Sequence, residues 1–380
     1  FDGHPVSFDW AGDDRLVVVA ARGVATELLE LPAAGGALKR LPLAEGLVVD
    51  ALDRAADGTL AFVAERPDRP AEPYRLAAGA AKPEPLADLN PWLSERRLGK
   101  QSVVRRKARD GVELEGILVE PLDRPAGTRV PLVLLVHGGP EAHVSNGWLT
   151  RYGEPGQLLA AKGIAALYPN YRGSTGRGLA FSKTSQGDPA GREFDDLVDA
   201  VDHLVAAGLA DPKKVGITGG SYGGYAANWA ATRFTERFAA AVSFVGIIDL
   251  TSKAGTTDIP IEDVDVHMLT MPWTRFEQSR ERSPLSYVAK ARTPLLILHG
   301  TADPRVHPTQ SLMLYRYLKL AGHPALRLVR YPGEGHGNRR AASQLDAAVR
   351  ILGWFEHYLL GAGGAPPAPE AADGAVLEVV

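Results

Sequence analysis

The sequence predicts an α/β protein: a mostly parallel sheet with helices on both faces, preceded by a smaller β-rich region. Two observations support this prediction. From about residue 101, short apolar runs alternate with amphipathic stretches, a pattern typical of βαβ units. Before residue 101, the apolar runs are short and follow turn residues, as in antiparallel sheets. We therefore divide the chain into residues 1–100, a main domain over 101–360 and a tail over 361–380.

The overall composition excludes several classes of protein. The formal net charge of −3 gives no attraction to nucleic acid or to an anionic membrane, so we expect neither partner. The chain has no cysteine, which excludes disulfides, thiolate metal sites and a cysteine nucleophile. No apolar run approaches the roughly 20 residues of a membrane span, so we expect a soluble protein.

The first hundred residues contain a repeated turn-and-strand unit. The turn Asp13-Asp14 precedes the apolar run 16–19, and Asp57-Gly58 precedes the run 60–63, an offset of 44 residues. One four-stranded propeller blade repeats about every 40–45 residues, which favours two blades of a β-propeller, although two ordinary hairpins fit the spacing equally well. Two blades cannot close a ring of about four to eight, so the blade interpretation makes this chain the C-terminal part of a longer protein.

The main domain contains seven apolar runs of strand length. Between the third and the fourth, Phe194, Leu197 and Val201 recur at helical spacing and predict a helix that covers the sheet. The tail is rich in glycine, alanine and proline and has little to bury, so we expect a flexible linker or a frayed terminus. The runs predicted as strands are 117–120, 132–136, 164–168, 215–218, 241–245, 295–298 and 326–331.

Ser221 lies in the motif with the clearest chemistry. Residues 219–223, Gly-Gly-Ser-Tyr-Gly, fit G-x-S-x-G between a predicted strand and a predicted helix. The tight turn needs small neighbours, because the serine adopts a strained conformation that projects its hydroxyl at the C-terminal edge of the sheet. A phosphate-binding loop is the alternative, but the Lys-Ser/Thr ending of such a loop is missing. The motif predicts a nucleophilic serine on an α/β-hydrolase fold.

A serine nucleophile needs a histidine base and an orienting acid, which follow it in the order Asp, His on this fold. Asp303 comes just beyond the run 295–298, and His336 comes beyond the run 326–331, so both are expected at the sheet edge that carries Ser221. Taken alone, Asp303 fits an Asp-Pro turn and His336 fits a solvated loop histidine. Three such residues in the right order at successive strand ends favour a catalytic triad.

Rival residues surround the predicted acid. Asp249 also follows a strand, and we interpret it as structural or pocket-lining. His299 and His307 flank Asp303, but His299 precedes the acid and lies one strand too early to serve as the base.

Acyl transfer also needs donors for the developing oxyanion. One is the backbone N–H of Tyr222, immediately after the nucleophile. The other is expected from the loop after the run 132–136, where His137-Gly138-Gly139-Pro140 is similar to the HGGG-type loop of lipases and esterases. A simple Gly-Gly-Pro turn is the alternative interpretation.

Taken together, these motifs resemble the prolyl oligopeptidase family of serine peptidases, and most of all its acylaminoacyl-peptidase and dipeptidyl-aminopeptidase-like branch. The resemblance covers about residues 103–360. It implies Ser221, Asp303 and His336 as the triad and the backbone amides of Gly139 and Tyr222 as the oxyanion hole. The motifs that carry the resemblance are 137–140 (HGGP), 169–176 (PNYRGSTG), 219–225 (GGSYGGY), 299–303 (HGTAD) and 335–337 (GHG).

The resemblance also implies a substrate site. His137 stands where prolyl oligopeptidases proper carry a tyrosine, which favours the acylaminoacyl-peptidase branch. Arg305 matches a family arginine near the substrate backbone, with a plain surface charge as the alternative. Leu250 stands where relatives often place a tryptophan in the pocket for the residue before the scissile bond. Trp148, Leu250 and Val306 suggest that this pocket is apolar.

Family members carry an N-terminal β-propeller that covers the active site, which favours the blade interpretation of residues 1–100. The chain begins at Phe1 rather than methionine, and we expect the missing blades to form a separate associated chain or to have been lost on cleavage. A homo-oligomer is left open, because family members often assemble. Cytoplasmic localisation is favoured, with secretion and the periplasm left open.

The function expected from the sequence is hydrolysis of short peptides through an acyl-enzyme, without a metal or an organic cofactor. Acylaminoacyl-peptidase, aminopeptidase and carboxypeptidase specificities stay open. The alternatives are a carboxylesterase of the same fold and a non-catalytic scaffold.

Overall fold

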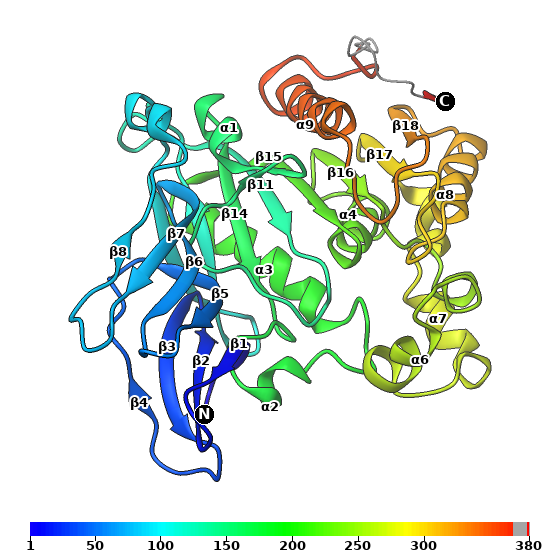
Figure 1. Ribbon diagram of the computed structural model, residues 1–380. Helices are drawn as coiled ribbons and strands as arrows, with labels where there is room; N and C mark the ends of the chain where they lie inside the picture. The colour runs from blue at the N-terminus through cyan, green and yellow to red at the C-terminus, as the bar shows by residue number, and fades with distance from the viewer. Residues whose placement is uncertain (368–377, 380) are drawn as a thin grey trace.

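A nine-stranded mixed sheet organises the main domain of the computed structural model, which describes residues 1–367 and 378–379 (Figure 1). Its strands are β9 (Gln101–Lys107), β10 (Glu113–Val119), β11 (Val130–Val136), β14 (Ala165–Asn170), β15 (Ala210–Gly220), β16 (Ala240–Phe244), β17 (Leu295–Gly300), β18 (Leu326–Tyr331) and β19 (Glu378–Val379). Their order is β19-β18-β17-β16-β15-β11-β14-β10-β9. The pairs from β14 through β18 are parallel, whereas β9, β10 and β19 pair antiparallel.

Helices cover both faces of this sheet. They are α1 (Gly156–Ala161), α2 (Leu179–Ser182), α3 (Arg192–Ala206), α4 (Tyr222–Thr232), α5 (Leu250–Ala254), α6 (Pro260–Glu262), α7 (Phe276–Glu281), α8 (Thr309–Leu320) and α9 (Ala341–Phe355). Shorter 3₁₀ or π segments are η1 (Pro91–Glu95), η2 (Asp263–Met268), η3 (Pro272–Thr274), η4 (Pro284–Lys290) and η5 (Glu356–Leu360). A separate two-stranded ribbon joins β12 (Thr150–Arg151) to β13 (Glu154–Pro155).

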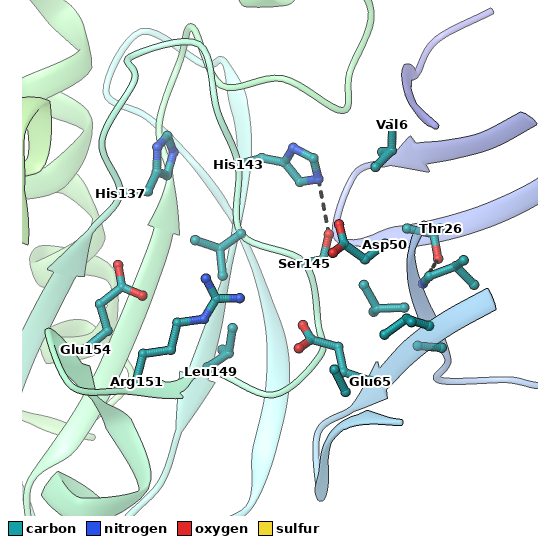
Figure 2. A pocket seen from close by; sticks show the side chains of 16 residues that line it. Val6, Thr26, Asp50, Glu65, His137, His143, Ser145, Leu149, Arg151 and Glu154 are labelled. Carbon is teal, nitrogen blue, oxygen red and sulfur yellow. Dashed lines mark hydrogen bonds between the residues drawn. The ribbon is translucent and has the colours of Figure 1, made fainter. Parts of the chain in front are cut away.

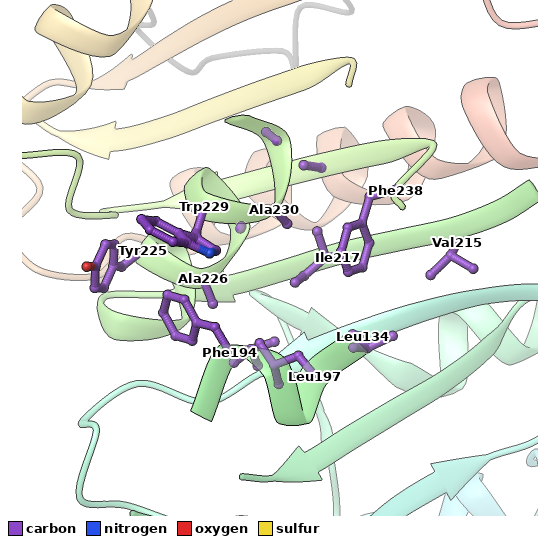
Figure 3. Close-up of a cluster of buried hydrophobic side chains, with 14 of the residues drawn as sticks. Leu134, Phe194, Leu197, Val215, Ile217, Tyr225, Ala226, Trp229, Ala230 and Phe238 are labelled. Carbon is purple, nitrogen blue, oxygen red and sulfur yellow. The ribbon is translucent and has the colours of Figure 1, made fainter. Parts of the chain in front are cut away.

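Two apolar clusters explain why the central strands read as continuous hydrophobic runs. Every residue of β11 is buried, and its side chains alternate between the two faces of the sheet. Leu132 and Leu134 join a cluster with α3, α4 and α8, whereas Val133 and Leu135 join a cluster with α1 and α9. In Figure 3, the side chain of Phe194 on α3 lies near the aromatic side chains of α4.

The α/β-hydrolase prediction is confirmed for the main domain. All seven runs predicted as strands overlap β10, β11, β14, β15, β16, β17 and β18, and the helix predicted from Phe194, Leu197 and Val201 is α3. Strand β9 was not predicted, because its sequence QSVVRRK is largely polar and partly exposed. The antiparallel edge strands make the sheet mixed.

The first hundred residues form two antiparallel sheets of the same strand order. One contains β1 (His4–Trp10), β2 (Arg15–Arg22), β3 (Ala25–Pro32) and β4 (Lys39–Arg40). The other contains β5 (Val48–Arg54), β6 (Leu60–Arg66), β7 (Arg69–Leu76) and β8 (Glu84–Pro85). Four strands are the content of one propeller blade, and the repeated runs lie in β2 and β6. The partial propeller itself stays a prediction.

The N-terminal sheets contact the main domain through backbone hydrogen bonds. At the turn between β2 and β3, Gly23 donates its N–H to the carbonyl oxygen of Gly176 at 2.7 Å. The next residue, Val24, accepts a hydrogen bond from Asn146 N–H at 2.7 Å, and its side chain is buried in a main-domain cluster. The two parts are therefore joined by main-chain contacts as well as by apolar packing.

The predicted flexible tail falls mostly outside the described residues. Residues 368–377 and 380 are outside them, so the prediction stays untested there. Within the described part, β19 pairs antiparallel with β18, with Val329 opposite Val379.

Candidate active site

Ser221 occupies the strained turn that its motif predicts. It lies between β15 and α4 with φ of 59° and ψ of −117°, a left-handed φ that costs a non-glycine residue about 1–3 kcal/mol. Its N–H donates to the carbonyl oxygen of Phe244 at 3.0 Å. A Cβ atom on Gly223 would lie 1.9 Å from the carbonyl oxygen of Val136, so only glycine allows the turn to pack against β11.

Asp303 and His336 form a hydrogen-bonded pair. His336 Nδ1 lies 2.8 Å from Asp303 Oδ2, and the other carboxylate oxygen accepts the backbone N–H groups of Arg305 at 2.9 Å and Val306 at 3.1 Å. Asp303 is 2% exposed. Burial opposes its ionisation, but hydrogen bonds from His299 and His336 outweigh burial and hold the pKa of this carboxyl well below its usual range.

The loops that carry this pair pack as one unit. Ala302 donates its N–H to the carbonyl oxygen of Glu334 at 2.9 Å, and Thr301 donates to the carbonyl oxygen of Tyr331 at 2.9 Å. A Cβ atom on Gly300 would lie 2.3 Å from the Glu334 carbonyl oxygen, so the two loops approach at backbone distance. Because β15, β17 and β18 are parallel, the loop after each of them emerges at the sheet edge where Ser221 lies.

The loop after β11 reaches the predicted nucleophile. A Cβ atom on Gly138 would lie 3.3 Å from Ser221 Cβ and 3.0 Å from the carbonyl oxygen of Gly220. Gly139 has φ of 122°, which residues with L side chains rarely adopt. Its peptide bond to Pro140 is cis. The structure therefore brings the predicted oxyanion loop next to Ser221.

The side chain of His137 contacts the backbone of this loop. Its Nδ1 lies 2.8 Å from the carbonyl oxygen of Gly138, its Nε2 lies 2.9 Å from Ser174 Oγ, and its ring stacks on Tyr171 at 4.3 Å between centroids. A carbonyl oxygen only accepts, so the contact with Gly138 is a hydrogen bond when Nδ1 carries the proton. Burial lowers the pKa of His137 to about 4, which keeps the ring neutral at ordinary pH. Because the peptide group is planar and trans, fixing the Gly138 carbonyl turns the Gly139 N–H to the opposite side.

Tyr222 has a buried partner that sequence reasoning did not find. Its backbone begins α4, and its hydroxyl donates to Glu193 Oε1 at 2.8 Å. Burial raises the pKa of Glu193 to about 8, so this side chain is largely protonated at neutral pH. From the sequence, an acidic residue beside Phe194 in the first turn of a helix is expected to be an exposed, favourable charge. Only the packing of α3 on α4 shows that this side chain is buried.

The residues predicted to bind substrate occupy different environments. Leu250 and Val306 are both buried in the cluster shared with α3 and α4, whereas Trp148 is half-buried outside that cluster and donates its indole N–H to the Thr150 carbonyl oxygen at 3.0 Å. Arg305 pairs with Asp258, with Nε 2.6 Å from Oδ1 and both side chains partly exposed.

The rival residues have other partners. Asp249 caps α5 by accepting the Ser252 N–H at 2.9 Å, in keeping with a structural role. His307 is exposed and contacts Thr309. His299 is buried, and its Nε2 lies 3.2 Å from Asp303 Oδ2.

A cavity of about 490 Å³ lies between the two N-terminal sheets, mainly the second, and the segment that follows β11 (Figure 2). His137 and His143 line it on the main-domain side, and Asp50 and Glu65 line it on the N-terminal side. Within residues 1–367 and 378–379, no group of three or more histidine or acidic side chains is arranged to hold a metal ion. No helix in that same part of the chain is long and apolar enough to cross a membrane.

A central parallel sheet, a serine in a strained strand-to-helix turn and an Asp-His pair at the same edge define the α/β-hydrolase class of fold. Residues 152–362 match the model of the prolyl oligopeptidase family. The chain belongs to that family, as its motifs indicated.

Named relatives agree with this assignment. The peptidase YuxL of Bacillus subtilis, described as uncharacterized, is 35% identical over 77% of this chain and 44% of its own length. Dipeptidyl aminopeptidase BIII of Pseudoxanthomonas mexicana is 35% identical over 70% of this chain and 40% of its own length. The acylaminoacyl peptidase structure of Pyrococcus horikoshii superposes with a TM-score of 0.84 at 25% identity, covering 98% of this chain and 57% of that one. The chain therefore spans about half the length of the relatives it matches.

Proposed function

We propose that the chain carries the catalytic domain of a serine peptidase that cleaves short peptides through an acyl-enzyme. The observation that supports this most directly is the Asp303–His336 hydrogen bond at the sheet edge that carries the strained Ser221. The family match and the two relatives named as peptidases support it independently. The separate propeller chain and the homo-oligomer find no support in these matches and stay predictions.

The mechanism follows from where the protons lie. Ionised Asp303 only accepts, so the neutral His336 ring carries its proton on Nδ1 and leaves Nε2 as a base. His336 takes the proton of Ser221 as the hydroxyl oxygen attacks the peptide carbonyl carbon, and Asp303 stabilises the imidazolium that forms. When the tetrahedral intermediate collapses, the C–N bond breaks and the imidazolium gives its proton to the leaving amine. Water then attacks the ester carbonyl carbon while His336 takes one of its protons, the ester C–O bond breaks, and the imidazolium returns that proton to the Ser221 oxygen as the acid product leaves.

The oxyanion is proposed to accept from the backbone N–H groups of Gly139 and Tyr222. The loop of Gly139 lies beside Ser221, and Tyr222 is the first residue of α4, whose N-terminal end carries a partial positive charge. Leu250 and Val306 are proposed to form the apolar wall for the residue before the scissile bond, with Trp148 as a further contact. Arg305 is proposed to release the Asp258 carboxylate and to bind the backbone of the substrate in its place.

Replacement of the nucleophile tests the proposal. We expect Ser221→Ala to lower kcat/KM for acylated and free aminoacyl p-nitroanilides by about 10⁴-fold or more, because no other group supplies the attacking oxygen. Ser182→Ala on α2 is the matched control and should keep full activity. Covalent labelling by a fluorophosphonate should be lost in Ser221→Ala alone.

Three outcomes would contradict the proposal. Unchanged turnover in Ser221→Ala would remove the nucleophile assignment. Cleavage of p-nitrophenyl esters without cleavage of any peptide would indicate a carboxylesterase. Absence of both activities and of labelling in the unmodified chain would indicate a non-catalytic scaffold. Peptides blocked at either end would then separate acylaminoacyl, aminopeptidase and carboxypeptidase specificities.

A further inference from the structure

A second histidine contacts the proposed catalytic acid, and the mechanism above does not use it. His299 is 1% exposed near the end of β17, four positions before Asp303. Its Nε2 lies 3.2 Å from Asp303 Oδ2 and 2.8 Å from the carbonyl oxygen of Val306. Its Nδ1 contacts the hydroxyl of Ser311, which is buried on α8. The ring is therefore held on both sides.

These partners fix the proton on the His299 ring. Both oxygens near Nε2 belong to acceptors, a carbonyl and a carboxylate, so Nε2 carries a proton. Nδ1 of the neutral ring is then an acceptor, and the Ser311 hydroxyl is placed to donate to it. The polar contacts run in one direction, from the Ser311 hydroxyl through the His299 ring to the Val306 carbonyl oxygen and Asp303 Oδ2.

Asp303 consequently has four N–H groups close to its two oxygens. His336 donates to Oδ2, and the backbone groups of Arg305 and Val306 donate to Oδ1. The His299 Nε2–H, which bonds the Val306 carbonyl oxygen, is also 3.2 Å from Oδ2 when measured from its nitrogen. The titratable or charged groups nearest this cluster are the two imidazoles and the Arg305 guanidinium, which is itself paired with Asp258. Rotation of the Asp303 carboxylate would therefore break contacts with N–H donors at both of its oxygens at once.

We propose that His299 is a positioning residue for the reaction. It fixes the rotation of the Asp303 carboxylate so that Oδ2 faces His336 Nδ1. Its N–H also offsets part of the negative charge of the carboxylate, so that less of this charge acts on His336. This inference rests on the proposed function, because the role exists only if Asp303 and His336 act as acid and base.

The test compares His299→Leu, which removes the donor, with His299→Gln, whose amide N–H reaches a similar position. We expect His299→Leu to lower kcat for an aminoacyl p-nitroanilide about tenfold or more with little change in KM. A carboxylate with one donor fewer also stabilises the protonated imidazole more strongly, so the acidic limb of the kcat/KM profile should move up by about half a pH unit or more. His299→Gln should restore much of both.

A matched control separates positioning from folding. His323 is also a buried histidine, but it lies between α8 and β18, at the opposite end of the strands from Asp303. His323→Leu should lower Tm without moving the acidic limb. If His299→Leu does not fold, Ser311→Ala replaces it, because loss of the hydroxyl leaves the ring free to turn; a smaller shift in the same direction is expected. An acidic limb unchanged in every folded His299 or Ser311 variant would overturn the inference.

A second measurement does not depend on turnover. In a Ser221→Ala background, the low-field proton resonance of His336 Nδ1–H can be followed by NMR as pH changes. His299→Leu should raise the midpoint of that titration, and an unchanged midpoint would overturn the inference. If the unmodified chain cleaves no peptide while the NMR midpoint still shifts, the proposed function fails and the contact between His299 and Asp303 stands.

Discussion

Single residues of the candidate site are held by partners that their own motifs do not contain. His137 reaches the Gly138 carbonyl, Ser174 contacts the far side of that ring, and Tyr222 reaches Glu193 on α3. Each contact crosses more than 25 positions of sequence or binds a main-chain group. The sequence predicted the groups proposed to react, because their motifs are short and local. Their supports depend on packing, which a motif does not describe.

His137 offers a direct test of the oxyanion loop. We expect His137→Ala to lower kcat for an aminoacyl p-nitroanilide by about 10²-fold, because the Gly138–Gly139 peptide loses the hydrogen bond that orients its N–H. KM should change much less, since the donor acts mainly in the transition state. His307→Ala, which changes an exposed histidine, is the control. A change confined to KM would contradict the assignment.

Glu193 makes the stability of the protein depend on pH between about 4 and about 8. Its pKa is raised by burial to about 8 in the folded chain, against about 4.3 when unfolded, so the folded state binds more protons between these values. The free energy of unfolding should therefore fall as pH rises from about 4 to about 8. Glu193→Gln removes this titration while keeping an acceptor for the Tyr222 hydroxyl.

Urea unfolding at two pH values measures this effect. Glu193→Gln should be more stable than the unmodified chain at pH about 8.5, by a few kcal/mol, and close to it at pH about 4.5. Glu277→Gln alters an exposed side chain and should show no such difference. Equal stability of Glu193→Gln and the unmodified chain at both pH values would show that Glu193 ionises freely in the folded state.

At the scale of elements, a buried ion pair joins the loop after β14 to α3. Arg172 binds Asp196 through Nη2 at 2.7 Å and Asp110, in the β9–β10 turn, through Nη1 at 2.7 Å. Asp196 is fully buried, so its charge depends on this arginine. The apolar periodicity of α3 predicted that it covers the sheet. The periodicity did not predict the ion pair, because Asp196 alone reads as a solvent-facing charge.

Replacement of Arg172 should reveal how much the buried charge of Asp196 destabilises the fold when its cation is removed. We expect Arg172→Met to lower the free energy of unfolding by about 3–5 kcal/mol, since the buried Asp196 carboxylate loses the cation that hydrogen-bonds it and keeps only the backbone N–H of residue 172. Arg237→Met breaks a surface pair with Asp202 and should change stability by about 1 kcal/mol or less. Denaturant unfolding at one pH compares the two. Similar small effects would mean that water or another group replaces Arg172.

At the scale of the whole molecule, the sequence predicted the sheet core better than its edges. Strands β11, β14, β16 and β17 are buried along their whole length and are apolar runs in the sequence, whereas β9 pairs at an exposed edge and carries polar residues. The 44-residue repeat predicted two similar units before residue 101, and β2 and β6 occupy equivalent places in two four-stranded sheets. How these sheets dock could not be predicted, because the main-chain hydrogen bonds of Gly23 and Val24 leave no mark in the side-chain pattern and a single buried valine side chain accompanies them.

That docking has a thermodynamic consequence. The cavity of about 490 Å³ is lined on one side by the two N-terminal sheets and on the other by the segment that begins with the proposed oxyanion loop. A molecule that binds there touches both parts of the chain, so its binding free energy adds to the free energy that holds them together. The affinity of the cavity for a bound molecule and the free energy that holds the two parts together are thus thermodynamically linked. A change that increases either one must increase the other.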